Sequence, residues 1–382
     1  MLVLKVNIGL ISVDSPDDRR TSSGTLYTIS ENLKTIGNVR WIPLRKSAVY
    51  RFIEIAFKVI GKMCRKNICF SHTVLGAKLL SKGININDFK NIDVLIAYLC
   101  GSSFGQINTS GIPSIYISDA TFPVMIDYYP PFCKLWKWNV RQGIDLEKMT
   151  MDNSSEVVLS SEWSANSAIN DLKQPPRKIH VIEFGANISD KDIVKRSFKF
   201  DGILNLLFLG VEWERKGGDI AVEATKWLNE NGIPTQLHIV GIKGLDERIK
   251  NLPFVQYIGF LNKNNETEYN RLIEEIHNCH ALILPTHAEC SAIAFAEASA
   301  YGLPTFTFQT GGIPSYIENG RNGYMLSPDS TGEDFGRLIA RCLEDGRLEK
   351  MANSAKEVYS EKLNWSVWTE KMRNLIVCLT NK

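Results

Sequence analysis

Short apolar runs alternate with longer stretches of mixed polarity along most of the chain. The runs have the length of β-strands, and several of the stretches between them carry apolar residues at helical spacing, clearest at 25–36, 218–229 and 266–276. The predicted strands are Val3–Val13, Asp93–Tyr98, Ser114–Ser118, Glu156–Ser160, Lys178–Glu183, Asn205–Gly210, Gln236–Gly241, Val255–Ile258, Ala281–Leu284 and Thr305–Phe308. Strands separated by helices predict parallel sheets and an α/β fold.

The strands fall into two series, which predicts two doubly wound, Rossmann-like domains. We expect an N-terminal domain over 1–188 and a C-terminal domain over 189–360, joined within the polar, lysine-rich stretch 187–202. The last part of the chain, 361–382, is predicted to be a helix that packs back on the N-terminal domain. Its apolar stripe consists of Trp365, Trp368, Met372 and Leu375.

Composition excludes several protein classes. The chain has 382 residues with 44% hydrophobic and 23% charged residues, which is typical of a globular protein and excludes a disordered one. A net charge of +2 gives no reason to expect a nucleic-acid partner. The eight cysteines form no Cys-x-x-Cys pair, and the start of the chain does not read as a signal peptide, so we expect reduced thiols and a cytoplasmic location. No apolar run is long enough for a spanning helix.

The small net charge conceals an uneven distribution. Residues 1–188 carry 22 Lys+Arg and 16 Asp+Glu, whereas residues 189–382 carry 22 and 26. The segment 45–66 alone has seven basic residues and only Glu54, which accounts for the whole N-terminal excess. Its apolar residues recur at helical spacing. Two interpretations stay open: a core-packed helix with a solvated basic face, or a peripheral contact with an anionic membrane surface.

Three segments that each follow a predicted strand carry candidate binding chemistry. In the first, Gly210–Gly218, the cations Arg215 and Lys216 precede a helix start, which fits a diphosphate clamp and fits a solvated basic loop equally well. The second contains Glu289 and, two helical turns later, Glu297, whose carboxylates suit the vicinal hydroxyls of a sugar or ribose. The third contains the glycine pair that begins at Gly311, which either lets a ligand approach the backbone or makes a tight turn.

Taken in order, these segments resemble the C-terminal half of the retaining family-4 glycosyltransferases, which have the GT-B fold with two Rossmann-like domains facing a central cleft. The resemblance covers 205–330 well and rests on Arg-Lys-Gly at 215–217, Pro-Thr-x-x-Glu-x7-Glu at 285–297, Gly-Leu-Pro at 302–304 and Thr-Gly-Gly-Ile-Pro at 310–314. Upstream, Ser-Ser-Gly-Thr at 22–25 and Ile-Ser-Asp-Ala-Thr-Phe at 117–122 are similar to two further segments of that family.

The resemblance implies a role for each matching position. Arg215 and Lys216 would neutralise the donor diphosphate, and Glu289 would bind hydroxyls of the donor sugar. Glu297 would hold the nucleotide ribose, and Asp119 stands where relatives carry a catalytic-site histidine or acid. The remaining donor contacts are implied for Gly24, Gly259, Phe260, Ser291, Ala292, Ile293 and Gly311.

The predicted function is therefore retaining transfer of a sugar, a hexosyl or hexosaminyl group, from a UDP- or GDP-sugar to a glycan, lipid-linked or protein acceptor, as in polysaccharide biosynthesis. Fixed cations would stabilise the leaving diphosphate, so no metal and no other cofactor is expected. Two departures from the family, Val211 for an arginine and Ala292 within a Gly-Phe-Gly segment, leave a non-catalytic nucleotide-sugar-binding subunit as an alternative. A nucleotide-sugar epimerase is the other alternative, although His287 is the one histidine beside the predicted site.

Overall fold

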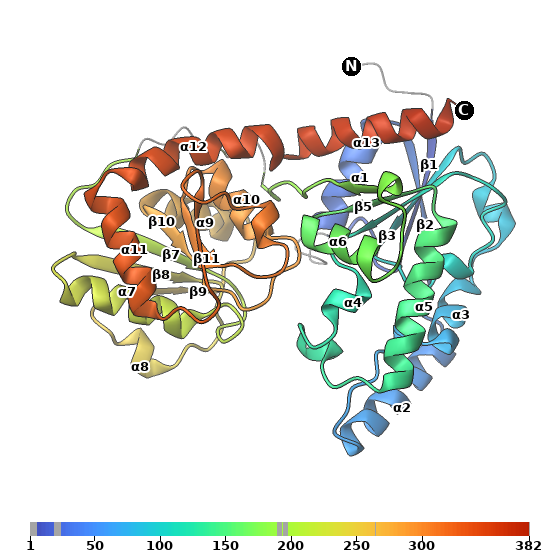
Figure 1. The fold of residues 1–382 in the computed structure, drawn as a ribbon, viewed down its shortest axis with the longest axis horizontal. Helices are drawn as coiled ribbons and strands as arrows, with labels where there is room; N and C mark the ends of the chain where they lie inside the picture. Colours follow the sequence, from blue (N-terminus) through green and yellow to red (C-terminus); the bar gives the residue numbers. More distant parts are fainter. Residues whose placement is uncertain (1–5, 19–23, 189–192, 194–197, 264, 382) are drawn as a thin grey trace. The chain divides into compact units, whose positions relative to one another are not determined.

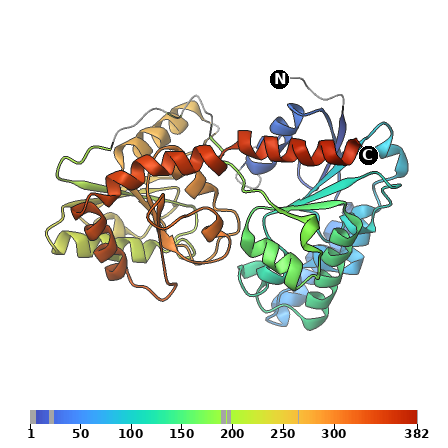
Figure 2. The ribbon, with the colours of Figure 1, turned by 45° about the horizontal axis from the view of Figure 1, so that its top comes forward.

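The structure is a computed structural model of the chain, and it describes residues 6–18, 24–188, 193, 198–263 and 265–381. The chain divides into two compact units (Figures 1 and 2). Unit 1 comprises Met1–Phe184 together with Trp365–Lys382, and unit 2 comprises Gly185–Asn364. Most of the predicted linker, residues 189–192 and 194–197, lies outside the described residues, as do Ser22 and Ser23 of the predicted N-terminal glycine loop.

Unit 1 is built on a parallel sheet of six strands in the order β2-β1-β3-β4-β5-β6. The strands are β1 Asn7–Ser12, β2 Asn38–Pro43, β3 Val94–Tyr98, β4 Ser114–Ser118, β5 Glu156–Leu159 and β6 Ile179–Val181. All residues of β3 and β4 are buried, as expected for strands covered on both faces. The sequence pattern missed β2, because this edge strand is mostly exposed and has no apolar run.

Helices cover this sheet on both sides (Figure 1). The helices of unit 1 are α1 Thr25–Lys34, α2 Ala48–Met63, α3 Val74–Ser81, α4 Phe122–Met125, α5 Lys137–Asn153, α6 Glu162–Asn170 and α13 Trp365–Thr380. Short 3-10 turns lie at η2 Phe70–His72, η3 Ile86–Phe89, η4 Phe104–Gln106, η5 Pro130–Phe132 and η6 Pro176–Lys178.

The C-terminal helix α13 packs on α1 and belongs to unit 1. Trp368 and Met372 are fully buried. The Thr369 hydroxyl donates to Asn32 Oδ1 at 2.8 Å, and the Arg373 guanidinium donates to the Thr35 carbonyl at 3.2 Å. These contacts join residues more than 300 positions apart, which makes the last helix an integral element of unit 1.

Unit 2 repeats the plan with a second parallel sheet, in the order β12-β11-β10-β7-β8-β9. The strands are β7 Leu204–Leu209, β8 Thr235–Val240, β9 Val255–Gly259, β10 Ala281–Ile283, β11 Thr305–Phe308 and β12 Gly323–Leu326. The helical elements are α7 Gly218–Glu230, α8 Glu247–Lys250, α9 Glu266–Asn278, α10 Ile293–Ala300, η8 Ile313–Ser315, α11 Gly332–Glu344 and α12 Arg347–Lys362.

Figure 1 shows α7 on one face of the unit 2 sheet and α9 and α10 on the other. The predicted α/β class with two doubly wound, Rossmann-like halves is therefore confirmed. Each predicted strand coincides with an observed one. The bounds differ most at β1, which spans Asn7–Ser12 of the predicted Val3–Val13, and at β6, which spans Ile179–Val181 of the predicted Lys178–Glu183. Within the described ranges, every helix is too short or too polar to span a bilayer.

Candidate functional site

The predicted donor residues of unit 2 gather at the carboxyl edge of its sheet. The chain leaves β7 toward β8 and β9 on one side, and β10 then pairs with β7 on the other side. The sheet order therefore reverses between β7 and β10, and ligands of open α/β sheets bind at such a reversal. The loop after β7 carries Arg215 and Lys216, and the loop after β10 carries Glu289.

Glycine allows these two loops to come close together. Gly217, the residue before α7, has a φ of 72°, and a Cβ on it would lie 2.1 Å from the carbonyl oxygen of Pro285. The amide of His287 in turn donates to the Arg215 carbonyl at 2.9 Å. The loops after β7 and β10 are thus joined through their backbones, and this fixes the positions of both cations.

The side chain of Arg215 is held across the same two loops. Its Nη1 donates to the Ala288 carbonyl at 2.8 Å, and its Nε donates to Glu212 Oε2 at 2.7 Å. The hydrogen bond from Arg215 holds the pKa of the Glu212 carboxyl below its ordinary value. Only 18% of the Arg215 side chain is exposed, so this guanidinium is oriented in advance of any ligand.

Glu289 is the common partner of both cations. Its Oε2 accepts a hydrogen bond from the ammonium of Lys216 and lies 3.9 Å from Arg215 Nη1. Lys216 and Glu289 are both largely buried, with side chains 10% and 16% exposed. The site therefore presents one carboxylate between two fixed cations, an arrangement that can accept an anion and sugar hydroxyls together.

Glu297 belongs to a second ion pair at the same edge of unit 2. It lies on α10, 6% exposed, and its Oε1 is 2.8 Å from the ammonium of Lys263. Lys263 lies in the loop after β9. The sequence analysis did not identify it, because the resemblance implies donor contacts in this loop only for Gly259 and Phe260. A signal existed, since Lys263 follows a predicted strand just as Arg215 and Glu289 do.

The remaining predicted donor contacts lie in loops beside these pairs. Gly259 has a φ of 82°, and the ring of Phe260 faces the ammonium of Lys243 at 4.1 Å from its centroid. Gly311 has a φ of 52°. The amide of the next residue, Gly312, donates to the Glu289 carbonyl at 3.0 Å, which ties the loop after β11 to the loop after β10.

The segment Ser291–Ile293 leads into α10. This helix begins at Ile293, its N-cap is Ala292, and no side chain caps it. The first turn of a helix presents backbone N–H groups that can donate hydrogen bonds to an anion. This segment therefore offers a ligand the backbone at the start of α10 and the hydroxyl of Ser291.

Unit 1 holds the other two predicted site residues at the carboxyl edge of its own sheet. Gly24 is the N-cap of α1 with a φ of 84°, as its left-handed conformation requires. Asp119 follows β4, and its backbone carbonyl accepts hydrogen bonds from Ser160 Oγ at 3.2 Å and Ser164 Oγ at 2.7 Å. Its carboxylate also interacts with a neighbouring acid, Glu147.

Glu147 is an acid that sequence reasoning did not single out. It lies on α5, is 3% exposed, and accepts hydrogen bonds from the Tyr116 hydroxyl at 3.0 Å and from the Phe122 amide. Burial raises the pKa of Glu147 to about 7. Nothing in the sequence distinguishes it from the other acids of α5, because its burial depends on tertiary packing.

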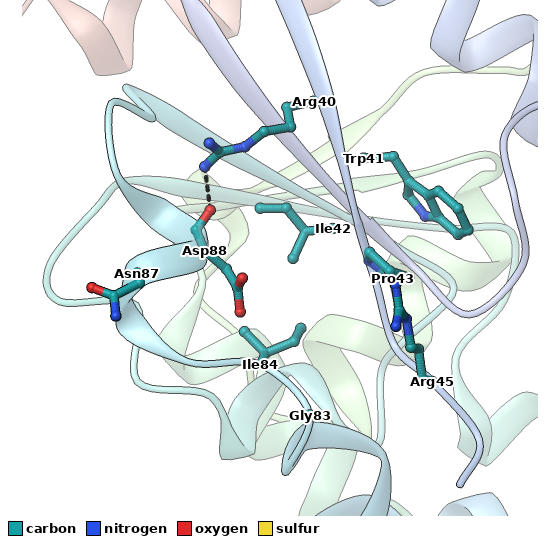
Figure 3. A pocket seen from close by; sticks show the side chains of 9 residues that line it. All are labelled: Arg40, Trp41, Ile42, Pro43, Arg45, Gly83, Ile84, Asn87 and Asp88. Carbon is teal, nitrogen blue, oxygen red and sulfur yellow. Dashed lines mark hydrogen bonds between the residues drawn. The ribbon is translucent and has the colours of Figure 1, made fainter.

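A pocket of about 350 Å³ in unit 1 lies elsewhere, along the edge strand β2 (Figure 3). There Arg40 donates to the backbone carbonyl of Asp88. None of the predicted site residues lines this pocket, whose walls are Arg40, Trp41, Ile42, Pro43, Arg45, Gly83, Ile84, Asn87 and Asp88. Among the described residues, no group of three or more His, Cys, Asp or Glu is arranged to hold a metal ion.

Comparison with known proteins identifies the domain that carries the two ion pairs. Residues 190–358 match the model of the family described as glycosyl transferases group 1. The D-inositol 3-phosphate glycosyltransferase of Gordonia bronchialis is 22% identical over 59% of this chain and 53% of its own length. The glycogen synthase of Mycobacterium tuberculosis is 26% identical over 55% and 51%. The chain thus spans about half the length of these curated relatives.

Solved structures extend the similarity to the whole fold. Anabaena Alr3699/HepE in complex with UDP superposes with a TM-score of 0.65 at 14% identity, over 98% of this chain and all of that one. Sucrose-phosphate synthase from Thermosynechococcus elongatus superposes with a TM-score of 0.68 at 15% identity, over 98% and 99%. Residues 190–358 are therefore similar to the glycosyl transferases group 1 family, and the chain as a whole has the two Rossmann-like domains of the GT-B fold.

Proposed function

We propose that this protein transfers a sugar from a nucleotide-diphosphate sugar to an acceptor, with retention of anomeric configuration. The observation that carries the proposal is the cluster at the sheet reversal of unit 2. There Lys216 and Arg215 share the carboxylate of Glu289. This combination offers positive charge to a diphosphate and a strong hydrogen-bond acceptor to a sugar in the same place.

The chemistry needs few protein groups. As the bond between the anomeric carbon and the diphosphate breaks, negative charge develops on the leaving phosphate and positive charge on the sugar ring. Arg215 and Lys216 are oriented in advance, so they stabilise the leaving phosphate without reorganisation. A leaving phosphate oxygen accepts the proton of the acceptor hydroxyl as that hydroxyl attacks from the same face. We propose that these cations make a metal ion unnecessary.

The other predicted residues complete the proposed donor site. Glu297 accepts hydrogen bonds from the ribose hydroxyls, and Lys263 balances its charge when the site is empty. Backbone amides at 291–293 and 311 contact the donor, and Gly259 and Phe260 border the base. Because the structural relative HepE forms complexes with UDP and UDP-glucose, UDP-sugars are the first donors to test, with GDP-sugars next.

We assign acceptor binding to unit 1. Asp119 is proposed to touch the acceptor or the donor sugar, and Gly24 to lie close to the donor phosphates. The proposed acceptor is a glycan, a lipid-linked sugar or a protein. A role in polysaccharide biosynthesis fits any acceptor of the first two kinds.

Thermal unfolding with a panel of UDP-, GDP- and ADP-sugars tests the donor assignment. A ligand that binds the folded state raises the free energy of unfolding by RT ln(1 + [L]/Kd). The correct donor should therefore raise the melting temperature more than the other sugars do. The selected donor is then incubated with and without candidate acceptors. Transfer supports the proposal, inversion of the free donor sugar would indicate an epimerase, and binding without any turnover would indicate a non-catalytic subunit.

A further inference from the structure

The helix α2 (Ala48–Met63) carries two apolar stripes on opposite sides. The inner stripe attaches it to unit 1: Tyr50 is fully buried, and Ile53 and Phe57 pack against the same small core. The rings of Phe57 and Phe70 lie 5.2 Å apart, and the ring of Phe57 also contacts that of Trp138. These residues hold α2 in place, and its opposite side is exposed among the residues that the structure describes.

The outer stripe is exposed despite its composition. Phe52, Ile55, Val59 and Met63 recur at intervals of three or four residues, so they share one face of the helix. Their exposed fractions are 75%, 60%, 53% and 79%. Single exposed apolar residues are common, but a row of large ones along about three turns of one helix indicates an interaction surface.

Cations border this outer stripe. Arg51, Lys58 and Lys62 are exposed and, at about 100° per residue, fall together on the flank between the inner and outer stripes. Four more basic residues precede or follow the helix, namely Arg45, Lys46, Arg65 and Lys66. The one acid, Glu54, is turned toward Lys46 and Lys58, at 3.8 Å and 3.9 Å. The surface as a whole is therefore apolar along the outer stripe, and it is positive along one flank and at the two ends of the helix.

We propose that α2 docks on an anionic lipid bilayer, with the outer stripe inserted among the lipid headgroups and acyl chains and the cations at the phosphates. A helix with one apolar face and cations beside that face lies in the plane of a membrane interface. Its 16 residues extend about 24 Å, long enough to lie flat on that surface and too short to cross it. The charge pattern favours lipid over a second copy of the same surface, because two such faces would bring their cations together.

The interpretation of segment 45–66 as a core-packed helix with a solvated basic face accounts for the inner stripe and for the exposed cations. It does not account for the exposed apolar residues of the outer stripe. The docking proposal is independent of the proposed transferase activity. It concerns unit 1, whereas the donor cluster lies in unit 2. A protein that binds vesicles but no nucleotide would refute the proposed function and leave the docking proposal intact.

Co-sedimentation of the full chain with vesicles tests the proposal. The vesicles contain either phosphatidylcholine alone or an equal mixture of phosphatidylcholine and the anionic lipid phosphatidylglycerol. We expect binding to the anionic vesicles and little to the neutral ones. The triple variant R51S/K58S/K62S should bind about a hundredfold more weakly, at about fivefold per cation. The variant F52S/I55S/V59S should also lose vesicle binding, because insertion into the bilayer requires the apolar outer stripe.

Matched variants separate the effect of position from that of composition. L75S/I86S/M149S removes three exposed apolar residues elsewhere in unit 1, and K78S/K82S/K90S removes three exposed lysines. Both should bind vesicles like the wild type. Thermal unfolding of every variant checks that the fold is retained, and a variant that unfolds early is replaced by its single substitutions.

Two results would overturn the proposal. The first is vesicle binding that does not change in either α2 variant while both remain folded. The second is a wild-type dimer in sedimentation velocity that F52S/I55S/V59S converts to a monomer, without vesicle binding in either form. That second result would assign the outer stripe to a contact between copies of the chain.

Discussion

The ammonium of Lys216 donates a hydrogen bond to the carboxylate of Glu289, across two loops that follow different strands and 73 positions of sequence. Both side chains are largely buried, and either one would be costly to leave unpaired. Arg215 lies near enough to Glu289 to share its charge. A bound diphosphate would therefore find two cations already in place, with a carboxylate that can turn to the sugar.

Replacing Lys216 with alanine should lower turnover far more than stability. We expect kcat for sugar transfer to fall about 100- to 1000-fold, the effect of removing one group that stabilises developing negative charge. The free energy of unfolding should fall by only about 1–3 kcal/mol, because Glu289 retains Arg215 as a partner. K226A, which removes an exposed lysine of α7, is the control and should change neither quantity. Wild-type turnover in K216A would refute the assignment.

Replacing Glu297 with alanine should weaken nucleotide binding. Two charge-assisted hydrogen bonds to ribose hydroxyls would be lost, so we expect Kd to rise about 10- to 100-fold in isothermal titration. Removing its partner in K263M should change Kd by less than about threefold, because Lys263 is 43% exposed and only balances the acid. The exposed acid Glu349 on α12 provides a matched control, E349A. Equal affinities in E297A and E349A would contradict the ribose assignment.

The sequence predicted the two sheets and the placement of Lys216 and Glu289 at one sheet edge because both depend on local patterns. Buried parallel strands are continuous apolar runs, and the residues that follow them converge at one edge of the sheet wherever the strands pair. That reasoning brings Lys216 and Glu289 together without coordinates. The same reasoning places Lys263 at that edge, but it does not pair Lys263 with Glu297, because this contact depends on the path of the loop after β9.

Burial on a helix was harder to predict. On α2 two apolar stripes share one segment, and the pattern alone cannot tell which stripe packs on Phe70 and which is exposed. Glu147 illustrates the same difficulty for an acid. Its surroundings come from Tyr116 and Phe122 on separate elements, so no local pattern marks it as buried.

Replacing Gly217 with alanine should destabilise unit 2 strongly. The added Cβ would lie 2.1 Å from the Pro285 carbonyl oxygen, and the φ of 72° is unfavourable for alanine. We expect a loss of more than about 2 kcal/mol in chemical denaturation. Gly232 is a matched control, since its φ is 83° but nothing lies within 4 Å of its added Cβ. G232A should therefore lose only about 1 kcal/mol, the conformational cost alone. Equal losses in the two variants would show that the close approach of the loops contributes nothing.

Glu147 should make stability depend on pH in a direction opposite to that of a surface acid. Burial raises its pKa from an ordinary value of 4.5 to about 7 in the folded protein. Between these values the folded chain holds a proton that the unfolded chain has released, so stability decreases as pH rises. The contribution is fully present below pH 4.5 and is lost by about pH 7, a change on the order of 3 kcal/mol.

The variant E147Q cannot titrate at this position and isolates the effect. Chemical denaturation at several pH values from 4.5 to 7.5 should show the wild type losing stability relative to E147Q as pH rises. E349Q, at an exposed acid, should follow the wild type throughout. A difference between wild type and E147Q that stays constant over this range would mean that Glu147 is already ionised in the folded protein, held by its hydrogen bonds from Tyr116 and Phe122.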